Sequence, residues 1–111
     1  MTEPVTLHLY DLLARVIARE GVKSCFALLG DANMNFATRL AEQGCDMIYV
    51  RHEHCAVAAA MAFARKTGDV GLATVTCGPG VTQLITALPA AVRAHLPVVV
   101  LAGEAALKSG W

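Results

Sequence analysis

Residues 70–84, VGLATVTCGPGVTQL, run from an apolar segment through a glycine-rich turn into the start of a helix. Residues 70–76 have the length and composition of a buried strand, and Cys77-Gly78-Pro79-Gly80 has the composition of a tight turn. Apolar residues at helical spacing predict a helix over residues 81–95, kinked at Pro89 because proline lacks the N–H and clashes with the preceding turn. A strand, a turn and a helix in succession are typical of an α/β fold.

The same alternation continues on both sides of this stretch. Helices are predicted over residues 6–20, 36–43 and 55–66, and further strands over residues 24–29, 46–50 and 97–102. The third of these helices is rich in alanine, which is typical of a buried helix packed close to its neighbours. The strands are continuous apolar runs, as in strands buried on both faces. The sequence therefore predicts an α/β fold with a parallel sheet and helices on both faces.

Composition limits the classes of function. The chain has 111 residues, of which 56% are hydrophobic and 16% charged, and its formal net charge is zero. A charged share so far below the usual quarter indicates that a partner or further sequence covers much of the surface. The sequence has no cluster of Lys and Arg, no apolar run long enough to span a membrane and no signal-peptide pattern. We therefore expect a cytoplasmic protein that binds neither nucleic acid nor a membrane.

Neither a disulfide framework nor a metal site is expected. The cysteines lack CxxC spacing and stand among apolar residues, so we expect them to be free and buried; they are Cys25, Cys45, Cys55 and Cys77. His52 and His54 stand next to Cys55, but no second group of ligands at zinc-like spacing accompanies them. We expect these histidines to form local hydrogen bonds.

Four loops follow the predicted strands and are expected to share one edge of the sheet, where ligands of such folds bind: residues 30–33, 51–53, 77–80 and 103–104. Within them, Glu53 opens the alanine-rich helix, so the helix dipole favours its negative charge. One interpretation is a carboxylate with no further function. The other is a buried carboxylate that needs a partner, such as a ligand with a basic or donor nitrogen. Position alone leaves both open.

The turn Gly78-Pro79-Gly80 also allows two interpretations. Its backbone N–H groups could contact an anion at the start of a helix, or its glycines could serve the tight turn alone. It matches neither the GxGxxG pattern nor the P-loop, since no Lys-Ser or Lys-Thr pair follows it. An ordinary nucleotide-binding domain is therefore disfavoured.

Four segments together resemble the pyrimidine-binding domain of thiamine-diphosphate enzymes. They are RHE at 51–53, AFARKTG at 62–68, VTCGPGVTQL at 75–84 and PVVVLAGE at 97–104. The group they resemble is acetolactate-synthase-like and includes decarboxylases and carboligases of 2-oxo acids, that is, lyases and transferases. The likeness covers almost the whole chain. The His-Glu pair is weak by itself, but its combination with the later two segments at this spacing is specific.

The resemblance implies a role for Glu53. In this family, the matching glutamate hydrogen-bonds N1′ of the aminopyrimidine ring of thiamine diphosphate and favours the imino form that removes the thiazolium C2 proton. The cofactor-binding positions that the resemblance implies are Glu53, Thr76, Gly78, Pro79 and Gln83. Family members hold the diphosphate through Mg²⁺ on a separate domain, of the same or another chain in a homo-oligomer (a dimer or tetramer). No metal ligand is expected in this chain. The resemblance leaves FAD as a possible second cofactor, which nothing in the sequence indicates.

The sequence departs from the family pattern at several positions. Cys77 replaces the usual Ser or Thr, Gln83 replaces the usual Asn, and Glu104 stands where Gln is frequent. Glu53 is retained, so pyrimidine binding is still expected. The departures leave the identity of the substrate undetermined. We expect residues 1–111 to be an N-terminal pyrimidine-binding domain, incomplete at its carboxyl end and inactive by itself. The alternative is a catalytically inactive truncated remnant or a partner-binding fragment.

Overall fold

The computed structural model describes residues 3–107, which form an α/β fold. The strands are β1 (Ser24–Ala27), β2 (Asp46–Tyr49), β3 (Gly71–Val75) and β4 (Val98–Ala102). The helices are α1 (Leu9–Arg19), α2 (Met34–Glu42), α3 (Glu53–Thr67), α4 (Pro79–Leu84) and α5 (Leu88–Arg93). Each strand and helix predicted from the sequence is present with slightly different ends, except that α4 and α5 together replace one predicted helix.

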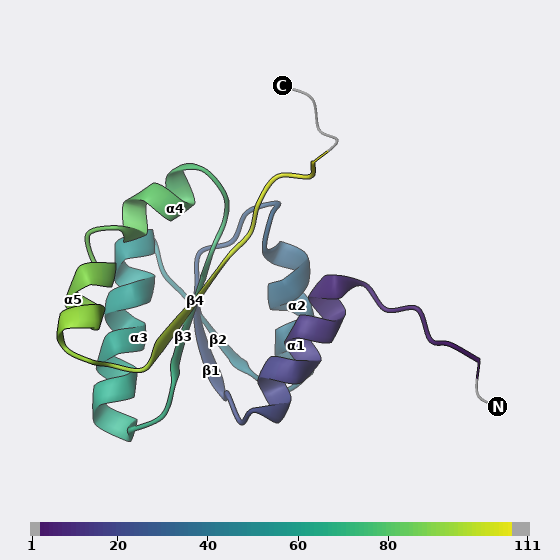
Figure 1. The fold of residues 1–111 in the computed structure, drawn as a ribbon, viewed down its shortest axis with the longest axis horizontal. Helices are drawn as coiled ribbons and strands as arrows, with labels where there is room; N and C mark the ends of the chain where they lie inside the picture. Colours follow the sequence, from purple (N-terminus) through teal and green to yellow (C-terminus); the bar gives the residue numbers. More distant parts are fainter. Residues whose placement is uncertain (1–2, 108–111) are drawn as a thin grey trace.

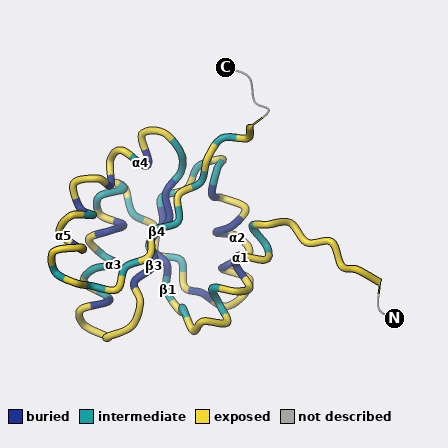
Figure 2. Tube along the Cα trace, viewed as in Figure 1, coloured by how far each residue is buried: buried dark blue, intermediate teal, exposed yellow. Residues whose placement is uncertain are grey.

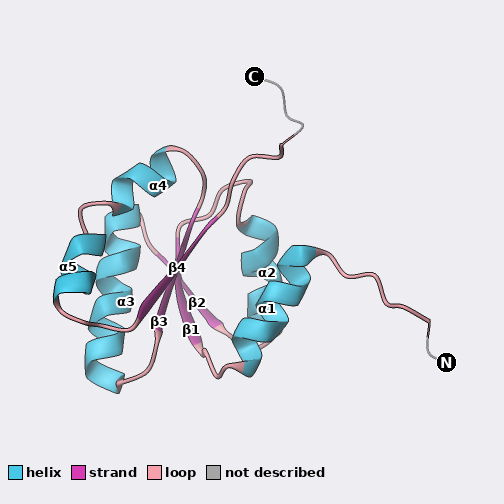
Figure 3. Ribbon diagram, viewed as in Figure 1, coloured by secondary structure: helices cyan, strands magenta, loops and turns pink. Residues whose placement is uncertain are grey.

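The four strands are all parallel and lie in the order β2-β1-β3-β4. Helices α1 and α2 cover one face of the sheet, and α3, α4 and α5 cover the other (Figure 1). Figure 3 shows the strands as a central layer between these two groups of helices. The predicted parallel sheet with helices on both faces is therefore confirmed.

The hydrophobic core has two parts, one on each face of the sheet. Strand β3 is buried along its whole length, and Figure 2 shows the buried segments at the centre of the molecule. The strand serves both parts of the core, because successive side chains of a strand point to opposite faces. Ala73 and Val75 belong to the part that includes α3, and Leu72 belongs to the other. Gly71 lets α3 approach closely, since a Cβ there would lie 2.1 Å from the carbonyl oxygen of Ala60. The alanine-rich helix therefore packs its backbone against β3, as its composition predicts.

The edge strands are more exposed than their apolar sequences predict. Strand β2 is exposed along most of its length, and Val99 of β4 is 50% exposed. An edge strand has a neighbour on one side only, and α1 and α2 pack mainly on each other rather than over β4. The apolar runs predicted the parallel sheet correctly, but their prediction of full burial is wrong for β2 and β4.

The predicted single helix over residues 81–95 is wrong, because α4 and α5 are separated at residues 85–87. Pro89 has no N–H to donate to the carbonyl of Ile85, four residues earlier, and its ring clashes with that carbonyl in a continuous helix. Pro89 instead lies in the first turn of α5, where a missing N–H removes no helical hydrogen bond. The proline therefore breaks the helix rather than kinking it.

The cysteines among the described residues are all free, as predicted, but not all are buried. Cys25 and Cys45 lie in the core part on the α1 and α2 face, whereas Cys77 is half-buried and Cys55 is exposed. Burial, and secondarily the Cys45 thiol, raises the pKa of Cys25 to about 12. The prediction of a buried side chain is therefore wrong for Cys55, which lies on the outer surface of α3.

Among residues 3–107, none of the helices has the length and apolar character that a membrane span requires.

Candidate functional site

The loops after β1 and β3 meet where the strand order of the sheet reverses. The chain leaves β1 towards one edge of the sheet and leaves β3 towards the other. In open α/β sheets, ligands bind at the carboxyl ends of the strands where the order reverses in this way. The end of β4 joins them, since a Cβ on Gly103 would lie 2.1 Å from the carbonyl oxygen of Ala32. Three of the four loops predicted to share this edge therefore lie together.

The fourth loop brings Glu53 to the same edge. His52 is the N-cap of α3, and its Nδ1 accepts a hydrogen bond of 3.0 Å from the backbone N–H of His54. This cap starts the helix at Glu53, where the positive end of the helix dipole stabilises the carboxylate. The Glu53 side chain is half-buried. Within residues 3–107 the carboxylate has neither an ion-pair nor a hydrogen-bond partner, so its oxygens are free to accept a hydrogen bond from a ligand.

Glycines place Thr76 beside Glu53. A Cβ on Gly80 would lie 3.9 Å from Oε1 of Glu53 and 3.3 Å from Cγ2 of Thr76. A Cβ on Gly30 would lie 2.7 Å from Oγ1 of Thr76, closer than real Cβ atoms approach. Thr76 is therefore held between the loop after β1 and the start of α4. Of the predicted positions, the structure brings Glu53 and Thr76 together, with Gly80 between them.

Gly78 lies in this turn, and Pro79 and Gln83 lie in α4. Gly78 has φ 63, in the left-handed region that favours glycine, and Pro79 occupies the first position of α4. All three are exposed, and no hydrogen bond within the described part of the chain joins any of them to Glu53. Their contact with a cofactor stays a prediction.

The turn forms its own hydrogen bonds. The N–H of Gly80 donates to the carbonyl of Cys77 over 3.3 Å, and the N–H of Val81 donates to the carbonyl of Gly78 over 3.0 Å. These amides are satisfied within the turn. The arrangement therefore favours a tight turn that lets other groups approach, rather than an anion-binding site.

Sequence reasoning missed a buried pair of polar side chains, Asn33 and Thr74. Asn33 is 1% exposed and Thr74 is fully buried. Nδ2 of Asn33 donates to Oγ1 of Thr74 over 3.2 Å, and Thr74 donates in turn to the carbonyl of Leu101 over 2.9 Å. Two features of the sequence could have indicated this pair: a threonine within an apolar strand and an asparagine after Gly30. Buried polar side chains need hydrogen-bond partners, so these two residues could be expected to bond to other groups.

No metal site is present in the described residues. No group of three or more His, Cys, Asp or Glu side chains within residues 3–107 is arranged to hold an ion. His52 forms the local hydrogen bond described above, as predicted, while His8 and His95 are exposed.

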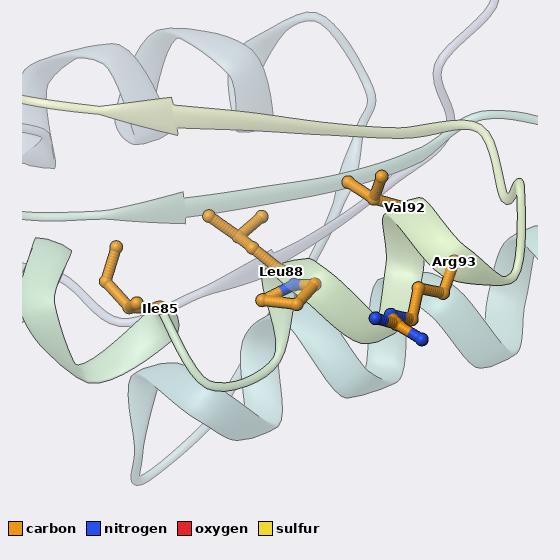
Figure 4. Close-up of a pocket in the computed structure, with 5 residues that line it drawn as sticks. Ile85, Leu88, Val92 and Arg93 are labelled. Atoms are coloured by element: carbon orange, nitrogen blue, oxygen red, sulfur yellow. The ribbon is translucent and has the colours of Figure 1, made fainter.

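A shallow apolar groove lies elsewhere, along α4 and α5. Its volume is about 350 Å³, and Figure 4 shows Ile85, Leu88, Val92 and Arg93 around it. Its lining residues are Ile85, which follows α4, and four residues of α5. Neither Glu53 nor Thr76 lines it, so it is separate from the site around Glu53.

Comparison with known proteins identifies the family of this chain. Residues 7–109 match the family model described as the thiamine pyrophosphate enzyme, N-terminal TPP binding domain. The chain belongs to this family. It therefore has the fold of the TPP-binding domain of thiamine-diphosphate-dependent enzymes, and the resemblance found in the sequence is confirmed.

The relatives of this TPP-binding domain are much longer proteins. The large subunit of acetolactate synthase isozyme 3 from Escherichia coli (strain K12) is 39% identical over 97 residues, which are 86% of this chain and 17% of the relative. The 2-hydroxyacyl-CoA lyase 2 of Xenopus laevis is 42% identical over 96 residues, which are 86% of this chain and 15% of the relative. The probable acetolactate synthase large subunit of Methanocaldococcus jannaschii is 35% identical over 98 residues, which are 88% of this chain and 17% of the relative. The chain thus spans less than a fifth of the length of these curated relatives.

Proposed function

We propose that this chain binds the aminopyrimidine ring of thiamine diphosphate in the crevice between the start of α3 and the turn before α4. The observation that carries the proposal is the Glu53 carboxylate, which is half-buried, has no partner within residues 3–107 and faces a glycine-lined turn. The chemical setting suits an aromatic ring with a basic nitrogen, because a partly buried carboxylate favours the protonated form of a nitrogen that it contacts.

The residues of the crevice fit this ring. The Glu53 carboxylate would accept a hydrogen bond from N1′ and hold a proton there. Gly80 has no side chain between Glu53 and Thr76, so a flat ring could come close to the backbone of the turn. Thr76, Gly78, Pro79 and Gln83 would form the surrounding wall. When bound, thiamine diphosphate supplies the carbon nucleophile and the electron sink for reactions of 2-oxo acids.

The proposal extends to a larger enzyme of the acetolactate-synthase type, a decarboxylase or carboligase. The relatives named above support this extension, since they include acetolactate synthases and 2-hydroxyacyl-CoA lyases. In such an enzyme a further domain, of the same or another chain in a homo-oligomer, would hold the diphosphate and its Mg²⁺. Glu53 would then be the residue of this chain that acts on the cofactor.

Calorimetric titration of the purified chain separates pyrimidine binding from diphosphate binding. Because the chain would contact only the pyrimidine, thiamine and thiamine diphosphate with Mg²⁺ should bind weakly and with similar affinity. Pyrophosphate with Mg²⁺ is the control and should not bind. Adding a candidate diphosphate-binding chain should strengthen the binding of thiamine diphosphate but not that of thiamine. Absence of thiamine binding under all these conditions would favour the inactive remnant.

A further inference from the structure

The loop after β1 contains a polar residue whose side chain does not cap its own helix. Asn33 is the N-cap of α2, a position where asparagine usually accepts a hydrogen bond from the backbone of the first helical turn. Its side chain makes no such bond. Oδ1 instead accepts a hydrogen bond of 2.8 Å from the N–H of Gly30, within the preceding loop. The helix thus lacks its usual cap, and the side chain serves the loop.

The other end of the Asn33 side chain reaches the centre of the sheet. Nδ2 donates to the carbonyl of Leu28 over 3.1 Å and to Oγ1 of Thr74 over 3.2 Å. The hydroxyl of Thr74 donates in turn to the carbonyl of Leu101 in β4. The side chains of Asn33 and Thr74 together therefore join the carboxyl ends of β1, β3 and β4. We call this pair the Asn33–Thr74 tie.

Contacts lead from this tie to the candidate site. The bond from Oδ1 fixes Gly30, and Gly30 packs so closely on Thr76 that a Cβ on Gly30 would overlap Oγ1, Cβ and Cγ2 of the threonine. Gly80 also lies close to Thr76, since a Cβ on Gly80 would lie 3.3 Å from Cγ2 of the threonine, and it borders Glu53. A shift of the loop at Gly30 would therefore move Thr76 relative to Glu53. Close packing in a protein interior transmits such displacements.

We propose that the Asn33–Thr74 tie is a positioning device, which sets the place of Thr76 beside Glu53 and so the width of the cofactor crevice. The inference rests on the proposed function, because it assigns to Thr76 a place in the wall of the pyrimidine site. Asn33 and Thr74 themselves are buried and do not touch the cofactor; they act through Gly30.

The test compares Thr74→Val, which removes the hydroxyl from a side chain of similar shape, with Thr74→Ser, which retains it. Leu40→Val is the matched control, because Leu40 is fully buried in α2 and takes no part in the tie. Two readouts need no ligand: hydrogen exchange of the Gly30 amide relative to that of Leu72, and the NMR shift of the Thr76 methyl group. The third is the dissociation constant for thiamine.

We expect the Gly30 amide of Thr74→Val to exchange about tenfold faster or more, since its hydrogen bond depends on an Asn33 side chain that has lost one partner. The Thr76 methyl resonance should move, and thiamine should bind several times more weakly. Thr74→Ser should behave like the unchanged chain, and Leu40→Val should change none of the three readouts beyond its general loss of stability. If Thr74 contributed to stability alone, Thr74→Val would change the three readouts no more than Leu40→Val does.

The outcomes that would overturn the proposal are separate from those that concern the proposed function. Unchanged Gly30 exchange and Thr76 shift in Thr74→Val would refute the tie, and so would failure of Thr74→Ser to restore them. A changed NMR shift of the Thr76 methyl group with an unchanged dissociation constant for thiamine would refute the role of Thr76 in the crevice. If the unchanged chain binds no thiamine, the proposed function fails and takes the crevice role with it. Should Thr74→Val not fold, Thr74→Ala provides the same readouts, because it also removes the hydroxyl that accepts from Nδ2 of Asn33.

Discussion

Glu53→Gln is expected to weaken cofactor binding and to impair cofactor activation while leaving the fold intact. The amide is almost the same shape as the carboxylate, but it carries no charge and does not favour a proton on N1′. A hydrogen bond to a charged group contributes about 1.5–3 kcal/mol, so thiamine should bind the variant chain at least about tenfold more weakly. In an assembled enzyme, loss of this proton-holding group should lower kcat by about a hundredfold or more. Calorimetry and steady-state kinetics measure the two effects.

The fold should tolerate Glu53→Gln, because the carboxylate has no ion pair or hydrogen bond to lose within residues 3–107. Only its interaction with the helix dipole is weakened, which costs about 0.3–1 kcal/mol. Glu20→Gln is the matched control, since it makes the same chemical change at the exposed carboxyl end of α1. Thiamine binding by Glu53→Gln equal to that of Glu20→Gln would contradict the role assigned to Glu53.

Gly71→Ala is expected to cause the largest loss of stability. The added methyl group would lie 2.1 Å from the carbonyl oxygen and 2.7 Å from the carbonyl carbon of Ala60, and backbone atoms in a helix cannot rotate away. Helix α3 would have to move off β3, at a cost of about 3 kcal/mol or more. For a domain of this size, that corresponds to a melting temperature lower by about 10 °C or more. Thermal unfolding followed by circular dichroism measures it.

Gly44→Ala distinguishes crowding from backbone strain. Gly44 has φ 91, and apart from Gly44 and its two chain neighbours no atom of residues 3–107 lies within 4 Å of an added Cβ. Alanine there should cost about 1–2 kcal/mol, through the left-handed conformation alone. A melting temperature of Gly71→Ala equal to or above that of Gly44→Ala would show that α3 and β3 are not in direct contact, and that the packing described above is wrong.

The elements that could be predicted from the sequence are those with a strong local signal. The helix ends predicted at residues 20, 43 and 66 each lie one residue from the observed ends of α1, α2 and α3. Gly21, Gly44 and Gly68 follow these ends and have positive φ angles, a conformation that glycine adopts readily. The break at Pro89 was only half predicted. A proline prevents the hydrogen bond to a residue four positions earlier, but whether the helix then bends or breaks depends on what it packs against.

Burial could not be predicted from apolar composition. Strand β4 is as apolar as β3, yet β3 lies between two strands and two layers of helices, whereas β4 lies at an edge. Strand order is a property of the whole chain, and no local pattern carries it. The exposure of Cys55 could not be predicted for the same reason, because the side of α3 that is exposed follows from the position of the helix on the sheet.

In the candidate site, too, some features could be predicted from the sequence and others could not. Glu53 was singled out from the sequence because it opens the alanine-rich helix, and the resemblance to a known family indicated both Glu53 and Thr76. The tie between Asn33 and Thr74 joins residues 41 positions apart, and only the register of β1, β3 and β4 brings them together. The role of Gly30 was likewise hidden, because its close contact with Thr76 is a feature of neighbouring loops rather than of either segment.

The most direct test of the account is a map of backbone amide shifts as thiamine is added to the isotopically labelled chain. NMR detects even weak binding, so the chain can be studied alone. We predict shifts concentrated at Glu53, Thr76 and the turn from Gly78 to Gly80, and none at the opposite edge of the sheet near Gly21 and Gly68. Shifts centred on the groove of α4 and α5, or an unchanged spectrum, would contradict a pyrimidine site at Glu53.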